Sequence, residues 1–123
     1  MVRTLRTFKV LVVDDEPAIR DLILAVLEDE GYLAVGASSA IHALEVIAKE
    51  QPDLVLMDIM MPEMDGREAF RRMRERPDLA AIPVVMMSAA YAADRVPDNV
   101  AGFLSKPFEL DHLLDTISAL LSA

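Results

Sequence analysis

Cysteine and tryptophan are absent from the 123-residue chain, and glycine occurs only four times. Without cysteine the chain can form no disulfide, no thiolate zinc site and no thiol nucleophile, which fits a reducing compartment. Because 54% of the residues are hydrophobic and glycine is scarce, collagen-like, low-complexity and disordered classes are excluded. We therefore expect a single globular domain over residues 1–123.

Long apolar segments are also missing. The longest apolar run, residues 79–87, is interrupted by Pro83 and is far shorter than the roughly 20 residues that span a bilayer. The basic residues near the start precede only a short apolar run, residues 10–13, which ends at Asp14 and Asp15. This pattern predicts no export signal and no membrane insertion, and we expect a cytoplasmic location.

Positive charge is in short supply. Twelve lysines and arginines stand against 21 aspartates and glutamates, so the formal net charge is -9. Such a surface repels phosphate backbones. We therefore expect no direct nucleic-acid partner.

The hydrophobic pattern alternates between short buried runs and longer segments with helical spacing, which is typical of a parallel α/β sheet. Strands are predicted at residues 8–13, 32–37, 54–58, 83–88 and 102–105. Five helices follow these strands, and the fold class is a doubly wound parallel sheet. In such sheets ligands bind beyond the carboxyl ends of the strands.

Proline and glycine set several predicted helix ends. The first helix begins at Pro17 and stops at Gly31, and Ser38 or Ser39 caps the second. The fourth helix, at residues 91–96, is weak and is cut by Pro97. We expect it to be short or irregular.

Polar residues cluster where the predicted strands end: Asp14 and Asp15, Asp58, Ser88 and Lys106. Three carboxylates at one sheet edge repel one another unless a cation supplies positive charge. An all-oxygen ligand set suits Mg²⁺, or alternatively Mn²⁺, better than zinc or copper. The lysine and the hydroxyl suit a bound phosphoryl group.

Four motifs in order, VVDDE at 12–16, MDIMMPEMDG at 57–66, MSA at 87–89 and KPF at 106–108, make the chain similar to response-regulator receiver domains. The resemblance covers essentially the whole chain. It implies the flavodoxin-like strand order 2-1-3-4-5 and phosphorylation of an aspartate by a partner histidine kinase. It also implies a conformational switch at a protein-binding surface and a cis peptide bond between Lys106 and Pro107.

By the same resemblance, Asp58 is the phosphoacceptor and Asp15 is a direct metal ligand. Asp14 would bind the metal mainly through water, and the backbone carbonyl of Met60 would be a further ligand. A carboxylate attacks phosphorus poorly until the phosphoryl charge is neutralised, which a metal and Lys106 would do.

The remaining roles also follow from the resemblance. Lys106 and Ser88 would contact phosphoryl oxygens, and Phe103 would be the switch aromatic. The side chains of Met60 and Ala90 would flank the path of the hydrolytic water and tune dephosphorylation. Neither side chain can hydrogen-bond that water.

Alternative functions are a phosphorelay carrier that exchanges phosphoryl groups with a histidine phosphotransfer protein, or the receiver of a longer regulator. A distant alternative is a haloacid-dehalogenase-type phosphohydrolase, whose nucleophile motif is DxD, whereas here Asp14 and Asp15 are adjacent. A receiver would catalyse only its own phosphorylation and dephosphorylation. The arginine run at residues 71–76 is interpreted as a solvated helix face.

Overall fold

The computed structural model describes residues 7–89 and 95–121. Within them, one parallel sheet has the strand order β2-β1-β3-β4-β5. The strands are β1 (Lys9–Val13), β2 (Leu33–Ala37), β3 (Leu54–Asp58), β4 (Val84–Ala89) and β5 (Gly102–Lys106). The helices are α1 (Pro17–Asp29), α2 (Ala40–Glu50), α3 (Gly66–Arg74) and α4 (Leu110–Leu121). The predicted fold class and strand order are confirmed.

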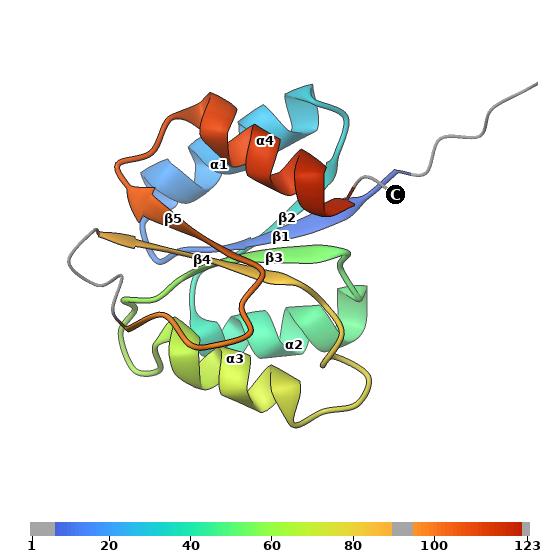
Figure 1. Ribbon diagram of the computed structural model, residues 1–123, viewed down its shortest axis with the longest axis vertical. Helices are drawn as coiled ribbons and strands as arrows, with labels where there is room; N and C mark the ends of the chain where they lie inside the picture. Colours follow the sequence, from blue (N-terminus) through green and yellow to red (C-terminus); the bar gives the residue numbers. More distant parts are fainter. Residues whose placement is uncertain (1–6, 90–94, 122–123) are drawn as a thin grey trace, which may run out of the picture.

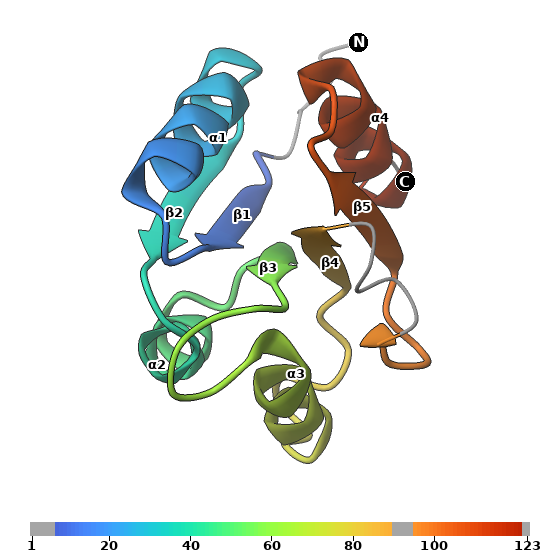
Figure 2. The ribbon, with the colours of Figure 1, turned by 90° about the vertical axis from the view of Figure 1, so that its left-hand side faces the viewer.

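The sheet lies between two helical layers. Helices α1 and α4 cover one face, and α2 and α3 cover the other (Figure 1). Figure 2 shows the strands crossing the molecule from β2 at the left to β5 at the right. Since β1 and β3 occupy the middle of the sheet, the site at their carboxyl ends has neighbouring strands on both sides.

Side chains along β1 alternate between the two faces of the sheet and pack against both helical layers. Val10 and Val12 belong to the core cluster under α1 and α4, which includes Ile23. Leu11 and Val13 belong to the cluster under α2 and α3, which includes Ile47. Successive side chains of a strand point to opposite faces, so an almost continuous apolar run is needed when both faces are buried.

The helix starts follow local chemistry. Pro17 occupies the first turn of α1, and the Ser39 hydroxyl accepts a hydrogen bond from the backbone N–H of His42 at 3.1 Å. The Asp65 carboxylate caps α3 by accepting from the N–H of Glu68 at 3.1 Å. These side chains satisfy N–H groups that have no acceptor within their own helix.

The number of helices differs from the prediction. The described residues contain four α-helices, and α4 corresponds to the fifth helix predicted from the sequence. Between β4 and β5, the described residues 95–101 contain no α-helix. Residues 91–94 of the fourth helix expected at 91–96 lie outside the described part. Pro97 has no N–H to donate, and Asn99 adopts a positive φ of 72°. Neither residue favours helix here.

No helix in the described ranges is long and apolar enough to cross a bilayer.

Candidate functional site

Four strands bring the predicted polar residues to one edge of the sheet. Asp14 and Asp15 follow β1, while Asp58 ends β3, where it pairs in register with Met87 of β4. One residue further along β4, Ser88 pairs with Ser105. Lys106 ends β5. The parallel register therefore aligns groups that are far apart in the sequence.

Lys106 joins two of the carboxylates. Its Nζ donates to Oδ2 of Asp14 at 2.8 Å and to Oδ2 of Asp58 at 3.2 Å. Asp14 is fully buried and Asp58 is 4% exposed. Buried charges are costly unless paired, so these two contacts orient both carboxylates and the ammonium group.

Burial and charge act together on the ionisation of this cluster. Burial raises the pKa of Asp58, and the negative charge of Asp14 raises it further, against the attraction of Lys106. Burial by itself lowers the pKa of Lys106, but its hydrogen bond to Asp14 and the charges of both aspartates outweigh burial and raise it. One ammonium thus faces two carboxylates, and the cluster lacks positive charge.

The aspartates fit a divalent cation. One carboxylate oxygen from each of Asp14, Asp15 and Asp58 lies within 4.8 Å of the others. Oxygen-only ligands and an excess of negative charge match the preference of Mg²⁺, which also retains water molecules. The donor set therefore fits the predicted ion.

The two carboxylates after β1 differ in their available oxygens. Oδ1 of Asp14 accepts from the N–H of Glu16 at 2.9 Å, and its Oδ2 accepts from Lys106. Asp15 is exposed, and within residues 7–89 and 95–121 no donor reaches its carboxylate. This difference favours direct ligation by Asp15 and contact through water by Asp14.

Two backbone contacts shape the loop after β3. The N–H of Met60 donates to Oδ1 of Asp58 at 3.2 Å, and the N–H of Gly66 donates to the carbonyl of Ile59 at 2.9 Å. A Cβ at Gly66 would lie 2.4 Å from the carbonyl oxygen of Asp58. Only glycine allows α3 to begin this close to the end of β3.

Arg20 is a site residue that the sequence analysis missed. Its Nη1 donates to the backbone carbonyl of Asp14 at 2.8 Å, which ties α1 to the turn that carries Asp14 and Asp15. The sequence signal is weak, because an arginine in the first turns of a helix is usually solvated.

The remaining predicted residues have different positions. Ser88 is 2% exposed at the sheet edge. Phe103 pairs with Met86 and packs, partly buried, against the core under α2 and α3. Met60 is 44% exposed, and Ala90 lies outside the described residues. The predicted cis peptide bond between Lys106 and Pro107 is confirmed.

A family model, the response regulator receiver domain, matches residues 10–118 and so includes the whole edge cluster. The chain belongs to this family. As a receiver domain of two-component response regulators, it is a signalling module.

Relatives of known sequence differ in length from this receiver. Response regulator MprA of Mycobacterium leprae is 37% identical over 120 residues, a match that covers 92% of this chain and 50% of MprA. The DNA-binding dual master transcriptional regulator RpaA of Synechocystis sp. is 35% identical, with 48% of its length covered. This chain thus spans about half the length of both. A 14.6 kDa protein of Leptolyngbya boryana is 40% identical over 112 residues, with 86% of its length covered.

Solved structures agree with the fold. Chemotaxis protein CheY4 of Vibrio cholerae has a TM-score of 0.87 at 29% identity, covering 94% of this chain and 100% of CheY4. The receiver domain of a signal transduction histidine kinase from Syntrophus aciditrophicus has a TM-score of 0.86 at 28% identity, covering 94% of this chain and 90% of that one.

Proposed function

We propose that this receiver is phosphorylated on Asp58 by a histidine kinase or a histidine phosphotransfer protein, and that it signals through a protein-binding surface. The observation that carries the proposal is the pair of hydrogen bonds from Lys106 Nζ to Asp14 and Asp58. These bonds supply a cation at the carboxylate that would become phosphorylated. The exposed Asp15 leaves the cluster open to solvent on one side.

In the proposed reaction, a carboxylate oxygen of Asp58 attacks the phosphorus of a phosphohistidine. A new O–P bond forms as the P–N bond breaks, and the leaving imidazole nitrogen keeps the electron pair and is protonated from water. The Lys106 ammonium exchanges its contact with the Asp58 carboxylate for a phosphoryl oxygen. The electrostatic preference of Lys106 for a group of greater negative charge stabilises the product.

The Mg²⁺ ion, or alternatively Mn²⁺, would be held by Asp15, Asp58 and the carbonyl of Met60, with Asp14 acting through water. When bound, the ion supplies charge neutralisation for the phosphoryl oxygens. The turn held by Arg20 keeps the carbonyl of Asp14, and hence the following Asp15, at the edge of the sheet.

The proposed switch links Ser88 to Phe103. After phosphorylation, the Ser88 hydroxyl would donate to a phosphoryl oxygen and move toward Asp58. Phe103 lies on the neighbouring strand and is only partly buried, so its ring has room to reorient as the end of β4 shifts. The output is a changed protein-binding surface, and catalysis is limited to phosphorylation and dephosphorylation of this chain.

An apolar groove next to Lys106 offers a docking surface for the phosphodonor protein. A groove of about 400 Å³ beside Lys106 is formed by α1 and the start of α4. Its lining is mainly apolar: Ile19, Leu22, Ile23, Pro107, Phe108 and Leu110. The phosphohistidine of the donor protein must come within bonding distance of Asp58. We therefore propose that the donor's helix that carries this histidine packs in the groove.

The signal could pass either to an attached domain or to a separate protein, and the proposed chemistry is compatible with both. As the receiver of a longer regulator, the chain would act on an attached domain, which the half-length matches to MprA and RpaA support. As a single-domain receiver or phosphorelay carrier, it would act on a separate protein, which the 86% coverage of the Leptolyngbya protein supports. A cytoplasmic location fits both.

Intact-mass spectrometry tests the phosphoacceptor. Incubation with a small phosphodonor and Mg²⁺ should add one phosphoryl group to the wild type and none to Asp58→Asn. Asp53→Asn, which removes another aspartate near β3, should be modified like the wild type. An adduct on Asp58→Asn, or an unmodified wild type, would contradict the assignment.

A further inference from the structure

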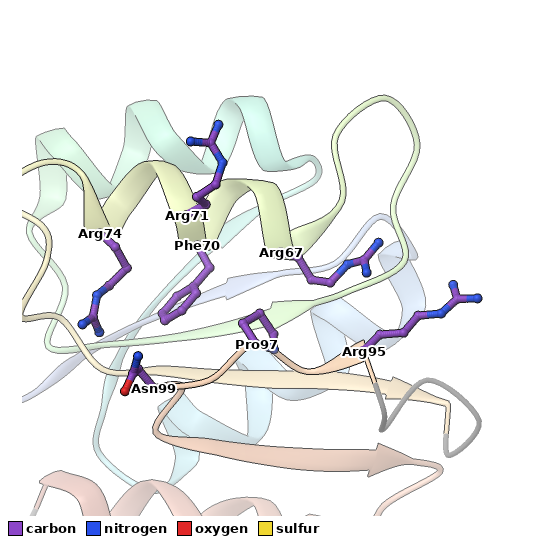
Figure 3. A pocket seen from close by; sticks show the side chains of 7 residues that line it. All are labelled: Arg67, Phe70, Arg71, Arg74, Arg95, Pro97 and Asn99. Atoms are coloured by element: carbon purple, nitrogen blue, oxygen red, sulfur yellow. The ribbon is translucent and has the colours of Figure 1, made fainter.

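A groove of about 470 Å³ lies between α3 and the chain that leads into β5, and none of the clustered aspartates lines it. Figure 3 shows Phe70 of α3 directed toward Pro97 on the opposite wall. Arg67 and Arg95 extend side by side on one side of this pair, and Arg74 and Asn99 lie on the other. The groove therefore has an apolar centre between two groups of polar side chains.

The apolar centre is formed by groups of unequal burial. Phe70 is 6% exposed and belongs to the core under α3, while Pro97 is half-buried. The position of Phe70 is consequently fixed by its packing in the core. A rigid apolar floor of this kind accommodates one apolar side chain at low entropic cost.

The arginines at the groove differ in whether they form ion pairs with carboxylates of this chain. Arg71 points away from the floor and is paired with Glu68 and Glu75. Arg74 lies over the Phe70 ring at 5.6 Å. Neither Arg74 nor Arg95 has an ion pair with a carboxylate in the described part of the chain. These two guanidinium groups retain donors for an external anion.

Arg67, beside Arg95, is fixed in place by an ion pair and has one side-chain donor without an acceptor inside the described segments. Its Nη2 is held by Asp65 at 2.9 Å, and its Nε is a buried donor without an acceptor among the described residues. Buried donors of this kind are rare. Arg67 is thereby oriented along the groove while its hydrogen bonding is incomplete.

We propose that this groove binds an acidic segment of another protein, with an apolar side chain over Phe70 and Pro97 and carboxylates at Arg95 and Arg74. The forked guanidinium groups match carboxylates, and the two arginines lie on opposite sides of the apolar centre. A short segment with a few carboxylates also suffers less repulsion from a chain of net charge -9 than a polyanionic nucleic acid does. The inference is independent of phosphorylation of Asp58.

Nuclear magnetic resonance of the isotopically labelled chain provides the first test. The probe is an end-blocked peptide with one leucine flanked on each side by two glutamates. We expect saturable shifts of the backbone amides of Phe70, Arg95 and Asn99. No saturable shift at these amides up to millimolar peptide, equal binding of a glutamine version, or the same shifts on raising the protein concentration alone would overturn the proposal.

Matched variants provide the second test. Arg74→Gln combined with Arg95→Gln should weaken peptide binding about tenfold, because both unpaired guanidinium groups are lost. Arg72→Gln combined with Arg76→Gln removes the same charge from exposed positions outside the groove and should change binding less than twofold. Equal weakening in the two double variants would overturn the proposal. Tighter binding of a short oligonucleotide through the same arginines would also overturn it.

Discussion

Asp58 illustrates how one residue is tuned by its surroundings. Its carboxylate is almost fully buried, accepts from Lys106 and from the N–H of Met60, and lies near the negative charge of Asp14. Burial is the largest effect and leaves its pKa raised above 3.8. The charged form, which the proposed chemistry needs, is therefore a cost to the fold that a bound cation would offset.

Neutralising Asp58 should stabilise the metal-free protein at pH 7. A folded-state pKa above the unfolded value means that the native state binds more protons, so this carboxylate contributes stability at low pH that is lost as pH rises through its folded pKa. Asp58→Asn should raise the free energy of unfolding at pH 7 by on the order of 1 kcal/mol, the usual size of a single-substitution effect.

Urea unfolding without Mg²⁺ measures this effect. The advantage of Asp58→Asn should shrink as pH falls toward 4. Asp21→Asn, at an exposed position on α1, serves as the matched control and should differ little from the wild type. A destabilised Asp58→Asn at pH 7 would show that the contact with Lys106 outweighs the cost of burial.

The lifetime of phosphorylated Asp58 should also depend on individual side chains, those of Met60 and Ala90. Met60 is 44% exposed beside Asp58 and has no group that can orient water. We expect slow hydrolysis, and we expect Met60→Asn or Ala90→Glu to accelerate it about tenfold by positioning the water. The decay of the phosphorylated protein in Mg²⁺ gives the rate. Rapid wild-type decay that neither substitution alters would exclude these positions as determinants.

At the scale of elements, the site depends on how α1, α3 and α4 approach the strand ends. Arg20 connects α1 to the turn after β1, and Gly66 allows α3 to contact the end of β3. On the outer face of α3, by contrast, arginines form ion pairs with glutamates three or four residues away. Hydrogen bonds from Arg71 and Arg72 lower the pKa of Glu68 to about 2, which agrees with a solvated helix face for these arginines.

The groove between α1 and α4 should govern transfer from a protein donor but not from a small molecule. Leu22 lines it and is 52% exposed. Leu22→Glu should slow phosphotransfer from a histidine kinase about tenfold, or about 1.4 kcal/mol, while phosphorylation by a small phosphodonor stays unchanged.

Leu33→Glu is the matched control for this prediction. Leu33 on β2 is equally exposed, at 52%, but lies outside the groove. The kinase is chosen from a panel by its transfer rate to the wild type. If Leu22→Glu and Leu33→Glu slow transfer equally, or if Leu22→Glu also slows the small phosphodonor, docking in this groove is refuted.

At the scale of the whole molecule, 21 acidic residues against 12 basic ones leave a strongly negative domain. Repulsion among these charges opposes folding, and three of the carboxylates meet at one edge. A cation bound there links the local charge excess to the stability of the whole domain, because any ligand of the native state shifts the unfolding equilibrium.

Mg²⁺ should therefore raise the melting temperature. At a free concentration of about one hundred times its Kd, a ligand raises the free energy of unfolding by roughly 2.7 kcal/mol. For a domain of this size, that raises the melting temperature by roughly 10 °C. Asp15→Ala should abolish most of this shift by removing a metal-ligating oxygen. Calorimetry with NaCl at the same ionic strength separates binding from screening. A full Mg²⁺ shift in Asp15→Ala would rule out Asp15 as a ligand.

The sheet and the edge cluster could be predicted from the amino-acid sequence alone. The apolar run Val10 to Val13 predicts a buried strand, and these residues are buried on both faces of the sheet. Helix starts at Pro17 and at Ser38 or Ser39 are predictable because capping is local, and the structure selects Ser39. Asp14, Asp15, Asp58 and Lys106 were predicted to meet because parallel strands end at a common edge.

Contacts between side chains far apart in sequence could not be predicted, because they depend on how the elements pack. The bond from Arg20 to the Asp14 carbonyl and the shared contact of Lys106 depend on how elements pack against one another. Likewise, Arg74 and Arg95 became part of one groove because α3 lies beside the chain entering β5. Hydrophobic periodicity specifies which face of an element is buried, but long side chains select their partners from whatever packing brings within reach.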